Sequence, residues 1–195
     1  GVDEIIFDTR NLQIDSVLYA KGQEAPYVLG KKDEILGEAL HIKLEDNTES
    51  ISVYYKTLED ATALQWLEAG QTFGKKHPFL YTQSESIHVR TWIPGPDSPG
   101  ARYTYTAKVE VPEGLMALMS AENPTEISAN GIYTFEMNEA IPGYLVALAV
   151  GDVVFEALDE RTGVYAEPAI IKEAVYEMGE VPSMVAAAEA IYGKY

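Results

Sequence analysis

The chain contains 195 residues, with 14 lysines and arginines against 31 aspartates and glutamates, and it has no cysteine. This length suits one ordinary domain, or one domain and part of another. The net charge of −17 argues against nucleic acid or an anionic membrane as a partner, because both are polyanions, and it favours a cationic ligand. The absence of cysteine excludes a disulfide framework and any zinc site built from thiolates.

Short segments of alternating side chains predict a body made of β-strands. Apolar and polar residues alternate over residues 38–44, 50–56, 87–93 and 102–111, which is typical of half-buried strands. Residues 115–121 and 144–150 are apolar on both sides and predict buried strands, and a further strand at 132–137 follows the turn Asn130-Gly131. The fold class is therefore all-β, a sandwich or saddle-like arrangement of sheets.

The C-terminal segment differs from this body. Residues 170–192 lose β-branched side chains and gain alanine and glutamate, which favours a helix. The helical spacing is carried by Met184, Ala187, Ala188 and Ile191, with Ser183 as a cap and Gly193 as the end. We therefore expect β structure to about Glu180 and then one short helix, giving domains at 1–180 and 181–195. Further upstream, residues 57–70 predict a short helical turn or a loop.

The chain shows no membrane or export signal. Its longest apolar run, near residues 144–150, is far shorter than the ~20 residues of a membrane helix. No basic segment followed by an apolar one opens the chain, so no signal peptide is visible. The chain begins at Gly1 rather than at methionine, and a leader removed earlier stays compatible with this. We expect no membrane insertion, leave the compartment open and favour the cytoplasm.

No catalytic motif is visible in the chain. His-Glu-x-x-His, Gly-x-Ser-x-Gly and the glycine-rich nucleotide loops do not occur. The three histidines, His41, His77 and His88, lack the spacing of a metal site. We expect His88 to be structural and His77 to lie in a turn. Taken alone, these residues describe an acidic β protein without recognisable catalytic machinery.

One segment nevertheless resembles a known family. Residues 77–90 (HPFLYTQSESIHVR) resemble the Gln-x-Glu segment of the aminopeptidase N-type zinc aminopeptidases, in the branch that contains leukotriene hydrolase. Flanking segments resemble the same branch in the same order, namely 63–67, 103–109, 115–121 and 141–148. Residues 180–192 resemble the start of that family's catalytic domain. The resemblance thus covers nearly the whole chain.

This resemblance implies that the chain is an N-terminal-domain fragment whose first strands are absent. In the family, zinc and the Gly-x-Met-Glu-Asn strand belong to the next domain. The chain would then contain no catalytic residue and no metal ligand, would bind no zinc and would be inactive alone. Its implied partners are the N-terminus of a peptide substrate and its own catalytic domain.

The resemblance also assigns roles to Glu85 and Gln83. Glu85 would bind the substrate's α-ammonium group through a charge-assisted hydrogen bond. Gln83, two residues earlier, would share a strand face with Glu85 and either contact the substrate or orient Glu85. Without the resemblance, a solvated surface acid is the commoner role for Glu85. Leukotriene hydrolase carries glutamine at this position, so the implied activity is peptide cleavage rather than epoxide hydrolysis.

The residues alone leave a second class of function open. The same strand pattern suits a free-standing β-sandwich that binds a peptide, a glycan or a protein, because a fold does not determine a function. The two readings differ in whether the gene continues past Tyr195 into the zinc-binding motif.

Overall fold

The computed structural model describes residues 3–194. The chain divides into two compact units, each built from three separate stretches of sequence. The first unit comprises residues 1–65, 82–105 and 138–147, and the second comprises residues 66–81, 106–137 and 148–195. Each unit is described by itself below.

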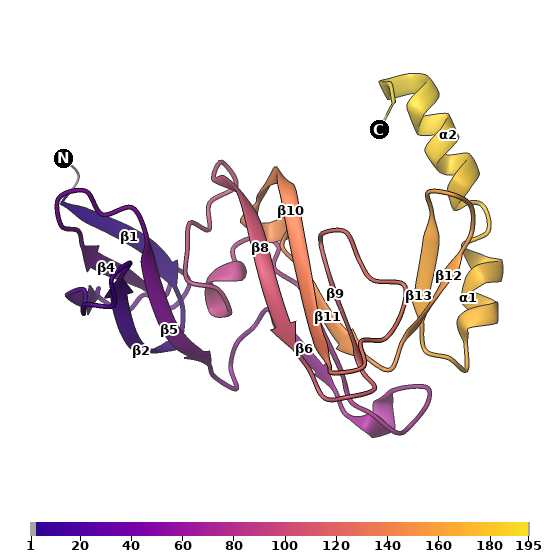
Figure 1. Ribbon diagram of the computed structural model, residues 1–195, viewed down its shortest axis with the longest axis horizontal. Coiled ribbons are helices and arrows are strands. Elements are labelled where there is room, and N and C mark those ends of the chain that lie inside the picture. Colours follow the sequence, from indigo (N-terminus) through magenta and orange to yellow (C-terminus); the bar gives the residue numbers. More distant parts are fainter. Residues whose placement is uncertain (1–2, 195) are drawn as a thin grey trace. The chain divides into compact units, whose positions relative to one another are not determined.

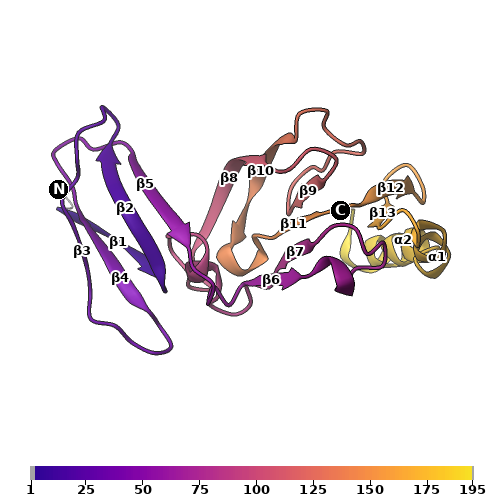
Figure 2. The same ribbon diagram turned by 90° about the horizontal axis from the view of Figure 1, so that it is seen from below.

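The N-terminal part of the first unit is a sandwich of two small antiparallel sheets. Its strands are β1 (Glu4–Thr9), β2 (Leu12–Tyr19), β3 (Tyr27–Leu29), β4 (Glu38–Lys43) and β5 (Ile51–Thr57). One sheet has the order β1-β4-β3 and the other pairs β2 with β5. Figures 1 and 2 show these five strands together at the N-terminal end of the ribbon.

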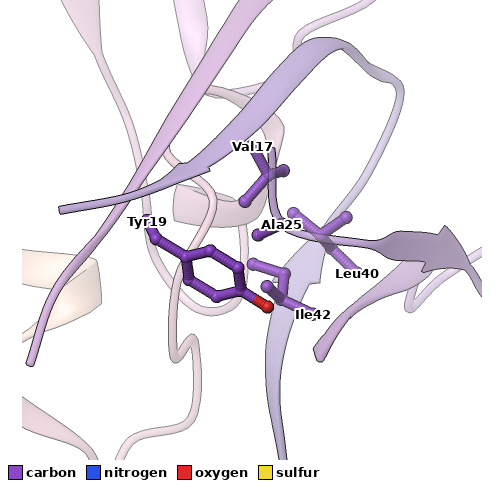
Figure 3. Close-up of a cluster of buried hydrophobic side chains, with 5 residues drawn as sticks. All are labelled: Val17, Tyr19, Ala25, Leu40 and Ile42. Carbon is purple, nitrogen blue, oxygen red and sulfur yellow. The ribbon is translucent and has the colours of Figure 1, made fainter. Parts of the chain in front are cut away.

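The core of this sandwich comes from one face of each sheet. Val17 and Tyr19 of β2 point toward Leu40 and Ile42 of β4, with Ala25 between them (Figure 3). All five side chains are less than a tenth exposed. Because alternate residues of a strand face opposite sides, the period-two pattern in the sequence places these side chains inside.

The other strands form a four-stranded sheet and two pairs. The sheet has the order β6-β7-β11-β9, the pairs are β10-β8 and β12-β13, and Figure 1 shows β8 beside β10. The bounds are β6 (Leu64–Leu67), β7 (Phe79–Thr82), β8 (Arg102–Glu110), β9 (Met116–Met119), β10 (Ile132–Pro142), β11 (Leu148–Gly151), β12 (Val154–Ala157) and β13 (Gly163–Ala166). Three 3-10 helices complete the loops: η1 (Ala69–Gln71), η2 (Val89–Thr91) and η3 (Gly143–Leu145).

A second hydrophobic core lies within the second unit. Met116 and Ala117 of β9 pack with Tyr133 and Phe135 of β10, and Val153 joins them. The Tyr133 hydroxyl donates to the Leu115 carbonyl oxygen and accepts from the Ser128 amide, each at 2.8 Å. The buried phenol is therefore fully paired, which allows a polar group at the centre of this core.

The structure confirms the all-β fold with a C-terminal helix. The predicted strands at 38–44, 50–56, 102–111, 115–121 and 132–137 are β4, β5, β8, β9 and β10. The exposed fraction alternates along β8 at every residue, as the sequence predicts. Among residues 3–194, no helix is long and apolar enough to cross a membrane.

Three predicted segments are wrong in detail. Residues 87–93 are a turn and the 3-10 helix η2 rather than a strand. The segment 57–70, predicted as a helical turn or loop, contains strand β6 because it gains neighbours in the four-stranded sheet. Residues 144–150 begin in η3, where Leu145 is half exposed, and only their last part is strand β11.

The C-terminal helix is present, but its start differs from the prediction. Helix α2 (Val181–Tyr192) ends at Gly193, where φ is +95°, as expected. Glu180 rather than Ser183 is its N-cap, because Pro182 occupies the first turn and places Ser183 inside the helix. A second helix, α1 (Ile171–Glu177), lies where β structure was expected, against the β12–β13 pair.

Gly131 gives a test of the β8–β10 connection. Its φ is +68°, and an added Cβ would collide with the Val111 carbonyl oxygen. We expect Gly131→Ala to lower the free energy of unfolding by about 2 kcal/mol, the sum of a φ penalty and a displaced backbone contact. Gly114→Ala is the control, since φ is +84° there but nothing lies within 4 Å. The positive φ alone should cost about 1 kcal/mol there. Equal losses in urea unfolding would disprove the collision.

Candidate functional site

Glu85 and Gln83 lie in a turn that begins where strand β7 ends at Thr82. The expectation that they share a strand face is therefore wrong. The structure instead joins them through a hydrogen bond, because the Glu85 amide donates to the Gln83 Oε1 at 3.1 Å. The Gln83 backbone N–H donates in turn to the Ala63 carbonyl oxygen at 2.8 Å. Gln83 thus connects the turn to the chain before β6.

The Glu85 side chain is exposed and carries a free carboxylate. Within residues 3–194 this carboxylate has no hydrogen-bond or ion-pair partner. Its neighbours in the sequence behave differently, since Ser84 is only 3% exposed. The turn therefore presents the Glu85 carboxylate to solvent, while the residue just before it, Ser84, is anchored in the interior.

Two hydrogen bonds hold Ser84 in the interior. Its hydroxyl accepts from the Trp92 indole N–H at 3.1 Å and donates to the Val146 carbonyl oxygen at 3.4 Å. Its own carbonyl oxygen accepts from the His88 amide at 2.9 Å, which closes the turn around Glu85. All of these residues belong to the first unit.

The 3-10 helix η2 follows this turn and buries a charged pair. Arg90 and Asp97 have side chains that are 5% and 2% exposed. The Asp97 carboxylate accepts from Arg90 Nε at 2.9 Å and from the Arg90 amide at 3.1 Å. Arg90 Nη2 also donates to the Asp97 carbonyl oxygen at 3.0 Å. Burial raises the pKa of Asp97 above its ordinary value, and the hydrogen bonds and charge of Arg90 act in the opposite direction.

The same pair connects η2 to the N-terminal sandwich. Arg90 Nη1 donates to the Leu36 carbonyl oxygen at 2.9 Å and lies 3.5 Å from the Asp8 carboxylate on β1. The Asp97 amide donates to Asp8 at 2.8 Å. These contacts explain why residues 87–93 are not a strand. Arg90 turns inward toward partners on other segments, and the amides of 91–93 bond to carbonyls three or four residues earlier.

The histidines have structural surroundings. His88 Nδ1 lies 2.7 Å from the Thr62 hydroxyl, and His41 Nδ1 lies 3.2 Å from the Glu4 carboxylate. His77 lies in the predicted loop, where its carbonyl oxygen accepts from the Thr72 hydroxyl. Among residues 3–194, no three His, Asp or Glu side chains gather in an arrangement that could hold a metal ion.

The fold is that of a β-rich N-terminal domain found in a class of peptidases. The family described as the peptidase M1 N-terminal domain matches residues 1–145, and the chain belongs to it. It is 36% identical to leukotriene A-4 hydrolase from Xenopus laevis, over 98% of this chain and 33% of that protein. It is 35% identical to leucine aminopeptidase 2 from Eremothecium gossypii, over 100% of this chain and 31% of that protein.

Solved structures agree with this assignment. Native leukotriene A4 hydrolase from Saccharomyces cerevisiae is 32% identical, with a TM-score of 0.88 over 100% of this chain and 31% of that one. An M1 zinc metallopeptidase from Deinococcus radiodurans is 19% identical, with a TM-score of 0.70 over 100% of this chain and 46% of that one, and it shares the fold. The chain thus spans about a third of the length of the curated relatives it matches.

Sequence reasoning identified the exposed residues of the turn but not the buried ones that hold it. Ser84, Trp92 and Asp97 were not singled out. A signal was present for Trp92 alone, because Trp92 and Arg90 occupy the side of residues 87–93 that an alternating strand would turn to solvent. A tryptophan on that side is unusual for an exposed face and indicates burial.

Proposed function

We propose that this chain is the N-terminal domain of a zinc-dependent aminopeptidase and that Glu85 binds the α-ammonium group of a peptide substrate. The observation that carries this proposal is the exposed Glu85 carboxylate, which has no partner within residues 3–194 and follows the buried Ser84 in the turn. A free carboxylate on a rigid backbone suits a cation that must be held at one position.

The chemistry of this site follows from the substrate's end. A peptide N-terminus is a primary ammonium with three N–H donors, and a carboxylate accepts such donors in short, charge-assisted hydrogen bonds. Fixing the terminus also fixes the first peptide bond relative to it, because the intervening residue has a constant length. Recognition of the terminus therefore supports removal of one residue at a time.

Gln83 supports this role by orienting the turn. Its Oε1 accepts the Glu85 amide, so the glutamine side chain is engaged with the backbone that carries the carboxylate. Of the two alternatives for Gln83, this contact favours orientation of Glu85. The side-chain nitrogen of Gln83, Nε2, stays available for a substrate carbonyl.

Zinc would be supplied from outside the described residues. Residues 3–194 hold no group of side chains that fits the metal, and the chain covers only about a third of its relatives. We propose that the remaining part of the natural protein binds the zinc and that this domain forms one wall of the substrate cleft. Epoxide hydrolysis is not part of the proposal.

The isolated chain tests whether zinc binding and catalysis need the remaining part of the protein. We expect chain 1–195, purified after growth with zinc, to contain far less than one zinc per chain and to release no amino acid from peptides. The full-length protein should cleave peptides with a free N-terminus and leave the N-acetylated peptides intact. One tightly bound zinc per isolated chain, or a natural gene that ends near Tyr195, would reject the proposal in favour of a free-standing binding module.

A further inference from the structure

Trp92 and Ser84 form a buried hydrogen bond directly beneath the turn that presents Glu85. We propose that these two side chains are positioning residues that set the direction of the Glu85 carboxylate. This inference rests on the proposed function, since it concerns the same ammonium-binding site. It assigns a role to two residues that face the interior and do not touch the substrate.

The first support is the pattern of burial along the turn. Gln83 and Glu85 are exposed, while Ser84 between them is 3% exposed. The side chains of these three residues therefore point alternately to solvent, to the interior and to solvent again. Ser84 can stay inside because its hydroxyl is paired with both the Trp92 indole and the Val146 carbonyl oxygen. A buried serine without partners would instead be drawn to water.

The second support is that Trp92 is itself held in place. It is 8% exposed. Its carbonyl oxygen accepts from the Tyr55 hydroxyl at 2.8 Å, and its amide donates to the Val89 carbonyl oxygen at 3.0 Å. The indole N–H therefore reaches Ser84 from a fixed backbone. The chain of contacts runs from strand β5 through Trp92 to Ser84 and then to Glu85.

The consequence is a carboxylate with little freedom in its backbone. Glu85 lies between a buried Ser84 and the His88 amide that closes the turn on the Ser84 carbonyl oxygen. Charge-assisted hydrogen bonds depend on distance and angle. A carboxylate whose backbone is held beforehand loses less entropy when it binds an ammonium group than one on a mobile turn.

The test uses the full-length protein and measures preference for the ammonium group. The probes are phenylalaninamide and 3-phenylpropanamide, which is the same amide without the α-amino group. The readout is the inhibition constant of 3-phenylpropanamide divided by that of phenylalaninamide, so a lower ratio means a weaker preference for the ammonium group. We expect Ser84→Ala and Trp92→Phe each to lower the preference for phenylalaninamide by about three- to tenfold. The double variant should lose no more than the worse single variant, because the Trp92–Ser84 hydrogen bond is already broken in each single variant.

Tyr133→Phe is the matched control for stability. Tyr133 is 4% exposed and also loses buried hydrogen bonds, to Leu115 and Ser128, but it lies in the core of the second unit. It should lower the thermal midpoint and leave the ratio of inhibition constants unchanged. If this control lowers the ratio as much as Ser84→Ala does, the effect is one of general stability and the positioning role is rejected.

Glu85→Gln separates the inference from the function on which it rests. If Glu85→Gln lowers the ratio while Ser84→Ala and Trp92→Phe leave it unchanged, the ammonium site stands and the positioning role is wrong. If Glu85→Gln itself leaves the ratio unchanged, the ammonium site is wrong and the positioning role is overturned with it. Additive losses in the double variant also contradict a shared hydrogen bond.

Discussion

Replacing Glu85 by glutamine in the full-length protein should lower kcat/KM for peptides with a free N-terminus by about 10- to 150-fold. The substitution keeps the shape of the side chain and removes its charge. The expected range corresponds to the roughly 1.5–3 kcal/mol that a hydrogen bond to a charged group contributes. Because the carboxylate has no partner within residues 3–194, its loss should cost the fold almost nothing. Steady-state kinetics together with thermal unfolding would measure both effects.

A matched control separates local recognition from the overall charge of −17. Glu110→Gln removes one negative charge from an exposed position on strand β8 and should leave kcat/KM within about twofold of the wild type. An equal loss in both variants would mean that long-range attraction of a cationic substrate, rather than contact at Glu85, carries the effect. An unchanged kcat/KM in Glu85→Gln would remove Glu85 from the site.

The fold could be predicted well where alternation and burial agree. In strand β8, apolar and polar residues alternate in the sequence, and partly buried and exposed side chains alternate at the same positions. Residues 87–93 alternate equally well, yet they form a turn and a 3-10 helix. There the supposed polar side contains Arg90 and Trp92, which are more buried than Ile87 and Ile93. A period-two pattern predicts a strand only if a partner strand is available. Here Arg90 and Trp92 instead turn inward to Asp97 and Ser84, which lie seven and eight residues away in the chain.

The site could be predicted only through its exposed residues. Glu85 and Gln83 stand out because a short motif within a long resemblance points to them. Ser84 and Asp97 carry no such mark, since serine and aspartate are common at surfaces. Their burial depends on Trp92 and Arg90, several residues away, and on a turn that alternation did not predict.

Asp97→Ala should lower the free energy of unfolding of the first unit by about 3–5 kcal/mol, the largest stability effect that we expect in this chain. The substitution leaves the Arg90 guanidinium buried, and its remaining partners are the Asp8 carboxylate at 3.5 Å, the Leu36 carbonyl oxygen and the backbone carbonyl oxygen of residue 97. It also removes acceptors from the Arg90 amide and Nε. A charge left buried with fewer partners is far more costly than the intact pair is stabilising. Urea unfolding of the chain would measure the loss.

Two comparisons make this prediction specific to burial. Asp97→Asn keeps an acceptor beside Arg90 and should cost less than Asp97→Ala, since burial itself disfavours the charged form and raises the pKa of Asp97. Asp15→Ala breaks an exposed ion pair with Lys56, in which the nitrogen and oxygen are 3.6 Å apart and the side chains are 67% and 39% exposed for Lys56 and Asp15. That loss should stay below about 1 kcal/mol. If Asp97→Ala costs no more than Asp15→Ala, the Arg90 pair does not hold η2, and the position of the turn that bears Glu85 depends instead on Gln83, Ser84 and Trp92.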